Sequence, residues 1–146
     1  MIPDLKLVTR VIMSVALTAT AVHSAAPVTL GKIQTARFPS GPGAGEPYLT
    51  TDPSGTVYAS WFEKAGVKGH VLKVSRLSGS SWSAPHVVAS GDSFFVNWAD
   101  TPILLALGGK RLALSWPWKS GGGTYSYDVR IAQSFDDGKT WSAPIT

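Results

Sequence analysis

Short apolar runs alternate with clusters of turn residues along most of the chain. Val, Ile, Leu, Tyr and Trp gather in runs that Gly, Pro, Ser and Asp interrupt, and no stretch after the first residues keeps a helical period. This pattern predicts an all-β protein. Strands are expected near residues 47–51, 56–62, 69–75 and 84–89, and again near 102–107, 111–117, 126–134 and from 142 onward.

The strand pattern occurs twice. "PYLTTDPSGTVYASW" (47–61) aligns without a gap with "PILLALGGKRLALSW" (102–116) at an offset of 55 (116 − 61). "VSRLSGSSWSAP" (74–85) aligns with "QSFDDGKTWSAP" (133–144) at an offset of 59 (141 − 82). Four strands in about 50 residues match one blade of a β-propeller. The sequence therefore predicts a propeller of four-stranded antiparallel blades, with about two blades in residues 47–146.

The first residues have the order of a secretory signal peptide. Lys6 and Arg10 precede an apolar run from Val11 to Val22, which small residues follow. That run is shorter than the ~20 residues of a membrane-spanning helix. We therefore expect a signal peptide (1–24), a lead-in segment (25–46) and two blades (47–146), in a secreted or periplasmic protein without membrane contact after cleavage. A propeller closes with roughly four to eight blades, so we expect an N-terminal part of a longer protein.

Composition excludes several classes of function. The 146-residue chain contains no Cys, which excludes disulfides and thiolate metal sites. Without residues 1–24 it carries 11 basic (13 − 2) and 8 acidic (9 − 1) residues, and the basic ones are scattered. This distribution does not favour a nucleic-acid partner. No metal-spaced His cluster or phosphate-binding Gly loop is visible, so no cofactor and no metal are predicted.

One turn carries a family resemblance. Ser134, Asp136, Gly138, Thr140 and Trp141 spell S-x-D-x-G-x-T-W, which resembles at all five positions the Asp box, or bacterial neuraminidase repeat, of the sialidase (neuraminidase) superfamily. An Asp there can accept hydrogen bonds from the turn backbone, the Gly can take a positive φ, and the Trp can pack between sheets. A calcium loop is the competing interpretation, but the spaced oxygen ligands and closing Glu of an EF-hand are missing.

The first copy is expected to hold a degenerate box. At an offset of 59 its five positions are Ser75, Leu77, Gly79, Ser81 and Trp82. A catalytic carboxylate would not be replaced by Leu in a parallel unit, so the box is interpreted as structural. Asp137 occupies a variable position of the motif and is expected to be solvated.

The resemblance implies both an activity and a location for it. Sialidases are six-bladed propellers with box turns on the face opposite the active site, and they cleave sialylated glycans by a retaining route with a Tyr nucleophile. The chain is therefore expected to belong to an exo-α-sialidase type of glycoside hydrolase with a carbohydrate substrate. The alternative is a non-catalytic propeller that binds glycan or protein. The candidate face consists of the loops 36–46, 62–70, 90–100 and 117–128.

Asp100 and Asp128 are the candidate acid/base residues on that face. Asp100 follows "FFVNW" and precedes the first strand of the second copy; a turn or strand cap is its alternative role. Asp128 lies in "YDVRIAQSFDDGKTW", which resembles the family's Asp-containing strand before a box. "RFP" resembles the family's Arg-Ile-Pro motif and makes Arg37 a candidate for binding the substrate carboxylate. In the repeat alignment, however, Gly45 and Asp100 take that arginine's place.

Aromatic residues are the remaining candidates. Trp98, Tyr125 and Tyr127 are expected to stack on sugar rings, with packing between blades as the alternative. Glu63 is expected to be exposed without a specific role. Lys73 and Arg130 alternate with apolar neighbours in third strands and are expected to face solvent.

Overall fold

The computed structural model describes residues 31–146; the predicted signal peptide lies outside them. Every regular element in this part is a strand and every strand pair is antiparallel, so the all-β prediction is confirmed. Residues 31–146 contain no helix of the length and apolarity needed to cross a bilayer. The strands are β1 (Ala44–Thr51), β2 (Val57–Ala65), β3 (Gly69–Ser78), β4 (Ser81–Trp82), β5 (His86–Gly91), β6 (Ile103–Gly108), β7 (Arg111–Lys119) and β8 (Tyr127–Ser134).

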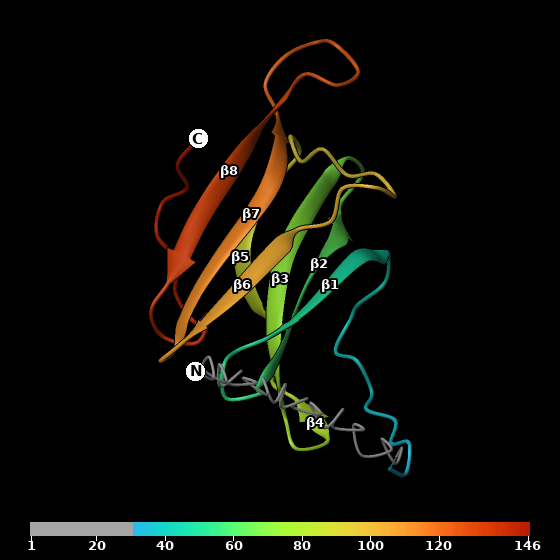
Figure 1. The fold of residues 1–146 in the computed structure, drawn as a ribbon. Helices are drawn as coiled ribbons and strands as arrows, with labels where there is room; N and C mark the ends of the chain where they lie inside the picture. The colour runs from blue at the N-terminus through green and yellow to red at the C-terminus, as the bar shows by residue number, and fades with distance from the viewer. Residues whose placement is uncertain (1–30) are drawn as a thin grey trace, which may run out of the picture. The chain divides into compact units, whose positions relative to one another are not determined.

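The strands form two sheets within the unit of residues 34–146 (Figure 1). In the first sheet β1, β2 and β3 follow one another, β5 pairs with β3, and the short β4 forms a hairpin with the end of β3. The second sheet has the order β6-β7-β8. A bridge between Ile131 and Ile145 marks the place where a fourth strand was expected. Seven of the eight predicted strands are therefore present as strands.

The core lies between the two sheets. Side chains alternate across a strand, so Leu112, Leu114 and Trp116 of β7 all face the first sheet. There they form one buried cluster with Phe62 and Leu72, among others. Packing between sheets therefore holds the unit together, in a chain that has no disulfide.

Strand β2 is buried on both sides. Tyr58 and Phe62 belong to the core between the sheets, whereas the ring of Trp61, on the other side, packs edge-on against Phe38 of the lead-in at 4.8 Å. Ser60, on the same side as Phe62, donates a hydrogen bond from its Oγ to the Pro102 carbonyl at 2.6 Å. This bond joins the first sheet directly to the start of the second.

The opposite face of the second sheet is apolar and exposed. Ile103, Leu105, Val129 and Ile131 lie on it. The equivalent residues Trp61 and Trp116 pair with Lys73 and Arg130, so Lys73 and Arg130 are equivalent as well. It follows that the neighbours of Lys73, Leu72 and Val74, correspond to Val129 and Ile131 of the second sheet. The first pair is buried against a neighbouring sheet and the second pair is not. The exposed face is therefore the counterpart of the face that the first sheet buries.

Candidate functional site

The strands end in two different environments (Figure 1). The β4 hairpin and the turn after β8 lie at one end, which we call the box end. The β5–β6 connection and the β7–β8 loop lie at the other, which we call the loop end. The Asp-box residues lie at the box end, whereas Trp98, Asp100 and Tyr125 lie at the loop end.

The β5–β6 connection is fixed to the second sheet at the loop end. Phe95 N donates to Pro117 O at 3.2 Å, and Lys119 N donates to Ser93 O at 2.8 Å. Phe94 is buried, with its ring centroid 4.9 Å from that of Trp118. Backbone pairing and a buried aromatic anchor thus hold this connection as an extension of the sheet.

Asp100 lies on a turn that Asn97 organises. The Asn97 side-chain oxygen accepts hydrogen bonds from Ala99 N at 2.7 Å and Asp100 N at 3.2 Å, as in an Asx turn. The Asn97 amide nitrogen donates to Asp100 Oδ2 at 2.5 Å. No described residue donates a hydrogen bond to Asp100 Oδ1, so one oxygen of this half-buried, oriented carboxylate is available to a ligand.

A cavity of about 370 Å³ opens beside Asp100. Phe95, Trp98 and Tyr125 line it, and 91% of Trp98 and 81% of Tyr125 are exposed. Phe95 also stacks on Tyr127 at 4.6 Å, and Tyr127 and Asp100 share a smaller neighbouring hollow of about 130 Å³. The structure therefore brings together four candidate residues: Trp98, Asp100, Tyr125 and, beside them, Tyr127.

The other two candidates lie elsewhere. Tyr127 and Val129 share the face of β8 that borders Asp100, so alternation directs Asp128 to the opposite face, where it is exposed and pairs in register with Trp118. Arg37 is exposed in the lead-in. Neither lines the cavity beside Asp100.

Glu63 is a polar centre that sequence reasoning missed, because the expectation that it is exposed is wrong. Only 7% of Glu63 is exposed, and its carboxylate accepts hydrogen bonds from Trp61 Nε1 at 2.8 Å, Gly41 N at 2.9 Å and Lys73 Nζ at 2.6 Å. Burial alone would raise the pKa of Glu63, but the bonds from Lys73, Gly41 and Trp61 outweigh it and hold the pKa below its ordinary value. Through its bond from Gly41 N, the Glu63 carboxylate links the lead-in to β2.

Lys73 and Arg130 do not simply face solvent. Lys73 is paired with Glu63, whereas the Arg130 guanidinium lies 4.0 Å from the centre of the Trp118 ring, a cation–π contact. The two residues are at the same register in the two sheets. The second sheet thus carries an aromatic partner where the first carries a carboxylate.

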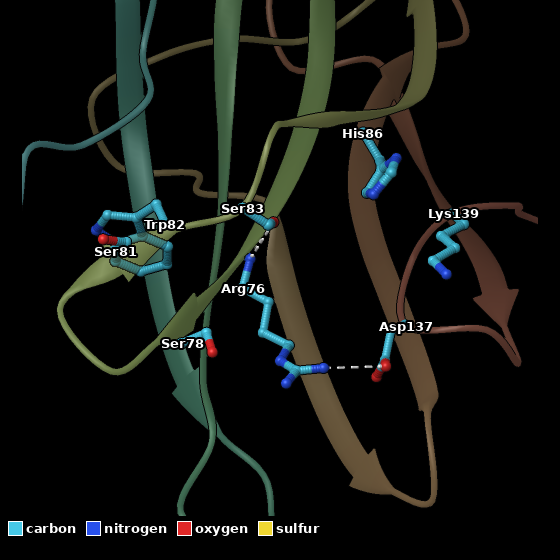
Figure 2. A pocket seen from close by; sticks show the side chains of 8 residues that line it. All are labelled: Arg76, Ser78, Ser81, Trp82, Ser83, His86, Asp137 and Lys139. Carbon is cyan, nitrogen blue, oxygen red and sulfur yellow. Dashed lines mark hydrogen bonds and ion pairs between the residues drawn. The ribbon is translucent and has the colours of Figure 1, made fainter.

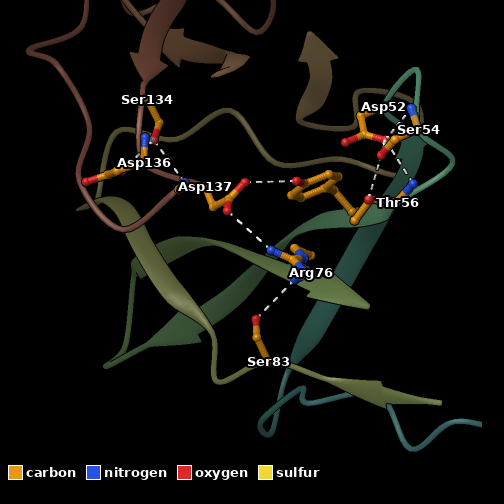
Figure 3. A network of polar contacts seen from close by, with 10 residues as sticks. Asp52, Ser54, Thr56, Arg76, Ser83, Ser134, Asp136 and Asp137 are labelled. Carbon is orange, nitrogen blue, oxygen red and sulfur yellow. Dashed lines mark hydrogen bonds and ion pairs between the residues drawn. The ribbon is translucent and has the colours of Figure 1, made fainter. Parts of the chain in front are cut away.

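The Asp-box residues form a hydrogen-bond network at the box end, of which Figure 3 shows Ser134 and Asp136. Asp136 Oδ1 accepts from Ser134 Oγ and Thr140 N, both at 2.9 Å, and its Oδ2 accepts from Thr140 Oγ1 at 2.6 Å. The bonds from the Thr140 hydroxyl and backbone lower the pKa of Asp136 to about 2. Gly138 has φ +84°, and its carbonyl accepts a hydrogen bond from Trp141 Nε1 at 2.9 Å. Asp136 is therefore committed to turn structure.

The expectation that Asp137 is solvated is wrong. Its carboxylate accepts from Tyr58 Oη at 3.0 Å and from Arg76 Nη1 at 3.2 Å, both in the first sheet (Figure 3). Its backbone, at φ 64°, donates to Lys110 O at 3.0 Å. Asp137 therefore fastens the box turn of the second sheet to the first sheet.

The degenerate box of the first copy is also corrected. Ser83 N donates a hydrogen bond to Arg76 O, and Arg76 N donates to Ser83 Oγ. Ser142 and Gln133 make the same two bonds. The bonded residues are seven (83 − 76) and nine (142 − 133) positions apart, so the third strands match at an offset of 57 (133 − 76) and the first turn is two residues shorter. Leu77, not Ser75, therefore corresponds to Ser134, and the first turn is a hairpin without a box.

Comparison with known proteins gives a likeness at the level of fold. No protein-family model matches the chain, and no curated protein matches it. An alpha-L-arabinanase from Penicillium chrysogenum, solved with arabinobiose, is similar with a TM-score of 0.53 and 17% identity over 68% of this chain and 32% of its own. The chain is a β-propeller fragment in fold. Its two sheets are blades, the box end and the loop end are the two faces of the propeller, and the chain spans about a third of the arabinanase.

A Hadza microbial sialidase is also similar, with a TM-score of 0.48 and 19% identity over 70% of this chain and 25% of that protein. Among residues 31–146, no group of three or more His, Asp or Glu side chains is arranged to hold a metal ion. The loop-end cavity is the candidate site because the Asp100 carboxylate and the exposed rings of Trp98 and Tyr125 surround it.

Proposed function

We propose that the loop end binds a carbohydrate and that the chain is part of a glycoside-hydrolase-type propeller. The observation that carries this proposal is the placement of Asp100 beside Trp98 and Tyr125 around one cavity. Aromatic faces suit the C–H surface of a sugar ring, and a carboxylate oxygen without a protein donor suits its hydroxyl groups. The arabinobiose bound by the similar arabinanase is consistent with this ligand class.

Exposure of the two rings supports a binding role over packing. Large aromatic side chains normally bury most of their surface, whereas Trp98 and Tyr125 are almost fully exposed. Phe95, by contrast, is buried and stacked on Tyr127, so its role in the cavity wall is packing. A ligand seated against these rings would cover apolar surface that is otherwise in contact with water.

For the reaction, we propose exo-α-sialidase-type hydrolysis with Asp100 as the acid/base group. The complete Asp box supports a sialidase-type family, and the oriented, half-buried carboxylate of Asp100 supports an acid/base role for that residue. The second candidate acid/base residue, Asp128, does not line the described cavity, since it lies on the opposite face of β8. That observation favours a second candidate function, glycan binding without hydrolysis.

Titration calorimetry with sialyllactose and with arabinobiose, together with release of a fluorogenic sialoside, tests these proposals. We expect saccharide binding that Trp98→Ala weakens by about tenfold, the loss of one stacked contact. Phe135→Ala, which removes an exposed ring at the box end, is the matched control. Binding unaffected by Trp98→Ala and Tyr125→Ala contradicts the carbohydrate site.

The variant Asp100→Asn separates hydrolysis from binding. Loss of sialoside release with binding retained supports the acid/base role, because the amide keeps the shape but cannot exchange a proton. Binding of saccharide without any release by the unmodified chain supports the non-catalytic alternative. Unchanged release in Asp100→Asn excludes Asp100 as the acid/base group.

A further inference from the structure

A second groove lies at the box end, away from the loop-end cavity (Figure 2). It has a volume of about 430 Å³ and runs between the two blades. Arg76, Trp82 and His86 come from β3, β4 and β5 of the first sheet; Asp137 and Lys139 come from the box turn of the second. Both blades therefore contribute to it.

Arg76 is held in place on this groove. Its Nη1 donates to Asp137 Oδ2 at 3.2 Å, and Asp137 Oδ1 accepts from the buried Tyr58 hydroxyl at 3.0 Å. A guanidinium has five N–H donors in a planar fork, and this is the one side-chain bond that Arg76 donates to a described residue. The side chain remains 42% exposed. Arg76 thus offers oriented donors to a ligand without needing to be ordered on binding.

The groove carries excess positive charge. Arg76 and Lys139 contribute two charges and Asp137 removes one, so the balance is +1 (2 − 1). Both oxygens of Asp137 already accept hydrogen bonds from the protein. Lys139 is exposed and His86 is half-buried on the same side of the groove as the Asp137 carboxylate (Figure 2). The complementary ligand is an anion.

Trp82 adds an apolar surface beside these cations. Its ring packs edge-on against Phe38 at 5.2 Å, which fixes the ring, and it is half-buried at the groove wall. An inorganic ion would leave this surface unused, whereas a sugar ring would cover it. We propose that this groove binds an acidic saccharide, with the sulfate or carboxylate group on Arg76 and Lys139 and the sugar ring on Trp82.

The proposal concerns the face opposite the loop-end cavity and does not depend on the function proposed there. Titration calorimetry on the full chain, with a heparin-derived sulfated disaccharide, its desulfated form, a galacturonic-acid oligomer and inorganic sulfate, tests it. The desulfated disaccharide and the galacturonic-acid oligomer carry carboxylates without sulfate, so comparing them with the sulfated disaccharide distinguishes the two sources of negative charge. Binding of either, tighter than inorganic sulfate and weakened by salt, is expected.

Matched variants assign the binding to the groove. The double variant His86→Gln/Lys139→Gln is expected to weaken binding about tenfold, while Lys119→Gln, which removes an exposed charge at the loop end, changes it less than about twofold. Trp82→Phe is expected to retain binding that Trp82→Ala loses, with circular dichroism confirming that both fold. Equal weakening by Lys119→Gln, or no binding of either acidic probe tighter than that of inorganic sulfate, overturns the proposal.

Discussion

Removing the Asp137 carboxylate should weaken the contact between the two blades. In Asp137→Ala the hydroxyl of Tyr58, a residue only 4% exposed, loses its acceptor, and a buried polar group without a partner costs about 1–3 kcal/mol. The ion pair with the partly exposed Arg76 adds about 0–1 kcal/mol. Ala is also less tolerant than Asp of φ 64°, which adds about 1 kcal/mol. We expect a total near 3 kcal/mol.

Chemical denaturation of the full chain, followed by tryptophan fluorescence, measures this loss. Asp128→Ala removes an exposed carboxylate with no hydrogen bond to the described residues and should change the free energy of unfolding by less than about 0.5 kcal/mol. A double-mutant cycle with Tyr58→Phe should give a coupling energy near 1 kcal/mol. If Asp137→Ala is as mild as Asp128→Ala, the bridging role assigned to Asp137 is refuted.

Three further outcomes follow from the packing and hydrogen bonds. Burial and the bond to Asp137 raise the pKa of Tyr58 to about 12; its contribution to stability is therefore full below about pH 10 and lost between about pH 10 and 12, and unfolding curves of Tyr58→Phe should lack this step. Gly138→Ala places a Cβ 3.0 Å from the Val74 side chain at φ +84° and should cost about 2–4 kcal/mol, against about 1 for Gly79→Ala, where the space is open; equal melting temperatures would contradict this. Trp61→Phe removes a hydrogen bond to Glu63, whereas Trp116→Phe removes a buried Nε1 that has no partner among residues 31–146. In denaturation, Trp61→Phe should therefore lower the free energy of unfolding by about 1–3 kcal/mol more than Trp116→Phe; equal losses would count against the Glu63 network.

The strands and the second-copy box were predictable because their signals are local. Alternating apolar runs and Gly-containing turns mark β1 to β3 and β5 to β8 within a few residues. The bonds that Asp136 makes in its turn connect residues at most four positions apart, so the spacing of the motif contains all of them. Local patterns of this kind can be recognised in the sequence without knowledge of the tertiary structure.

Contacts between distant parts of the chain were not predictable in this way. Asp137 bonds to Tyr58, 79 positions away, and Glu63 is buried by a lead-in residue, Gly41, 22 positions away. Nothing within either local pattern marks these partners. The two-residue shortening of the first turn was hidden because the offset at which "WSAP" aligns holds after the turn but not in the third strand before it. The pairing of Trp61 with Lys73 and of Trp116 with Arg130 reveals the difference.

At the loop end, the sequence identified residue types without identifying which of them meet. Asp100, Trp98 and Tyr125 gather because the β5–β6 connection folds onto the second sheet through Phe94. Asp128 was an equal candidate by sequence, but strand alternation places it on the other face of β8. The distinction required the register of β7 and β8, which composition does not contain.

The central claim, that the loop end binds carbohydrate, is tested most directly through the indole N–H signals of the tryptophans in ¹H–¹⁵N spectra. Trp98 protrudes beside Asp100, whereas the indole of Trp141 donates to the Gly138 carbonyl at the box end. On titration with sialyllactose or arabinobiose, the account predicts that the Trp98 signal shifts and saturates while the Trp141 signal stays in place. A Trp98 signal that does not move with either saccharide would contradict it.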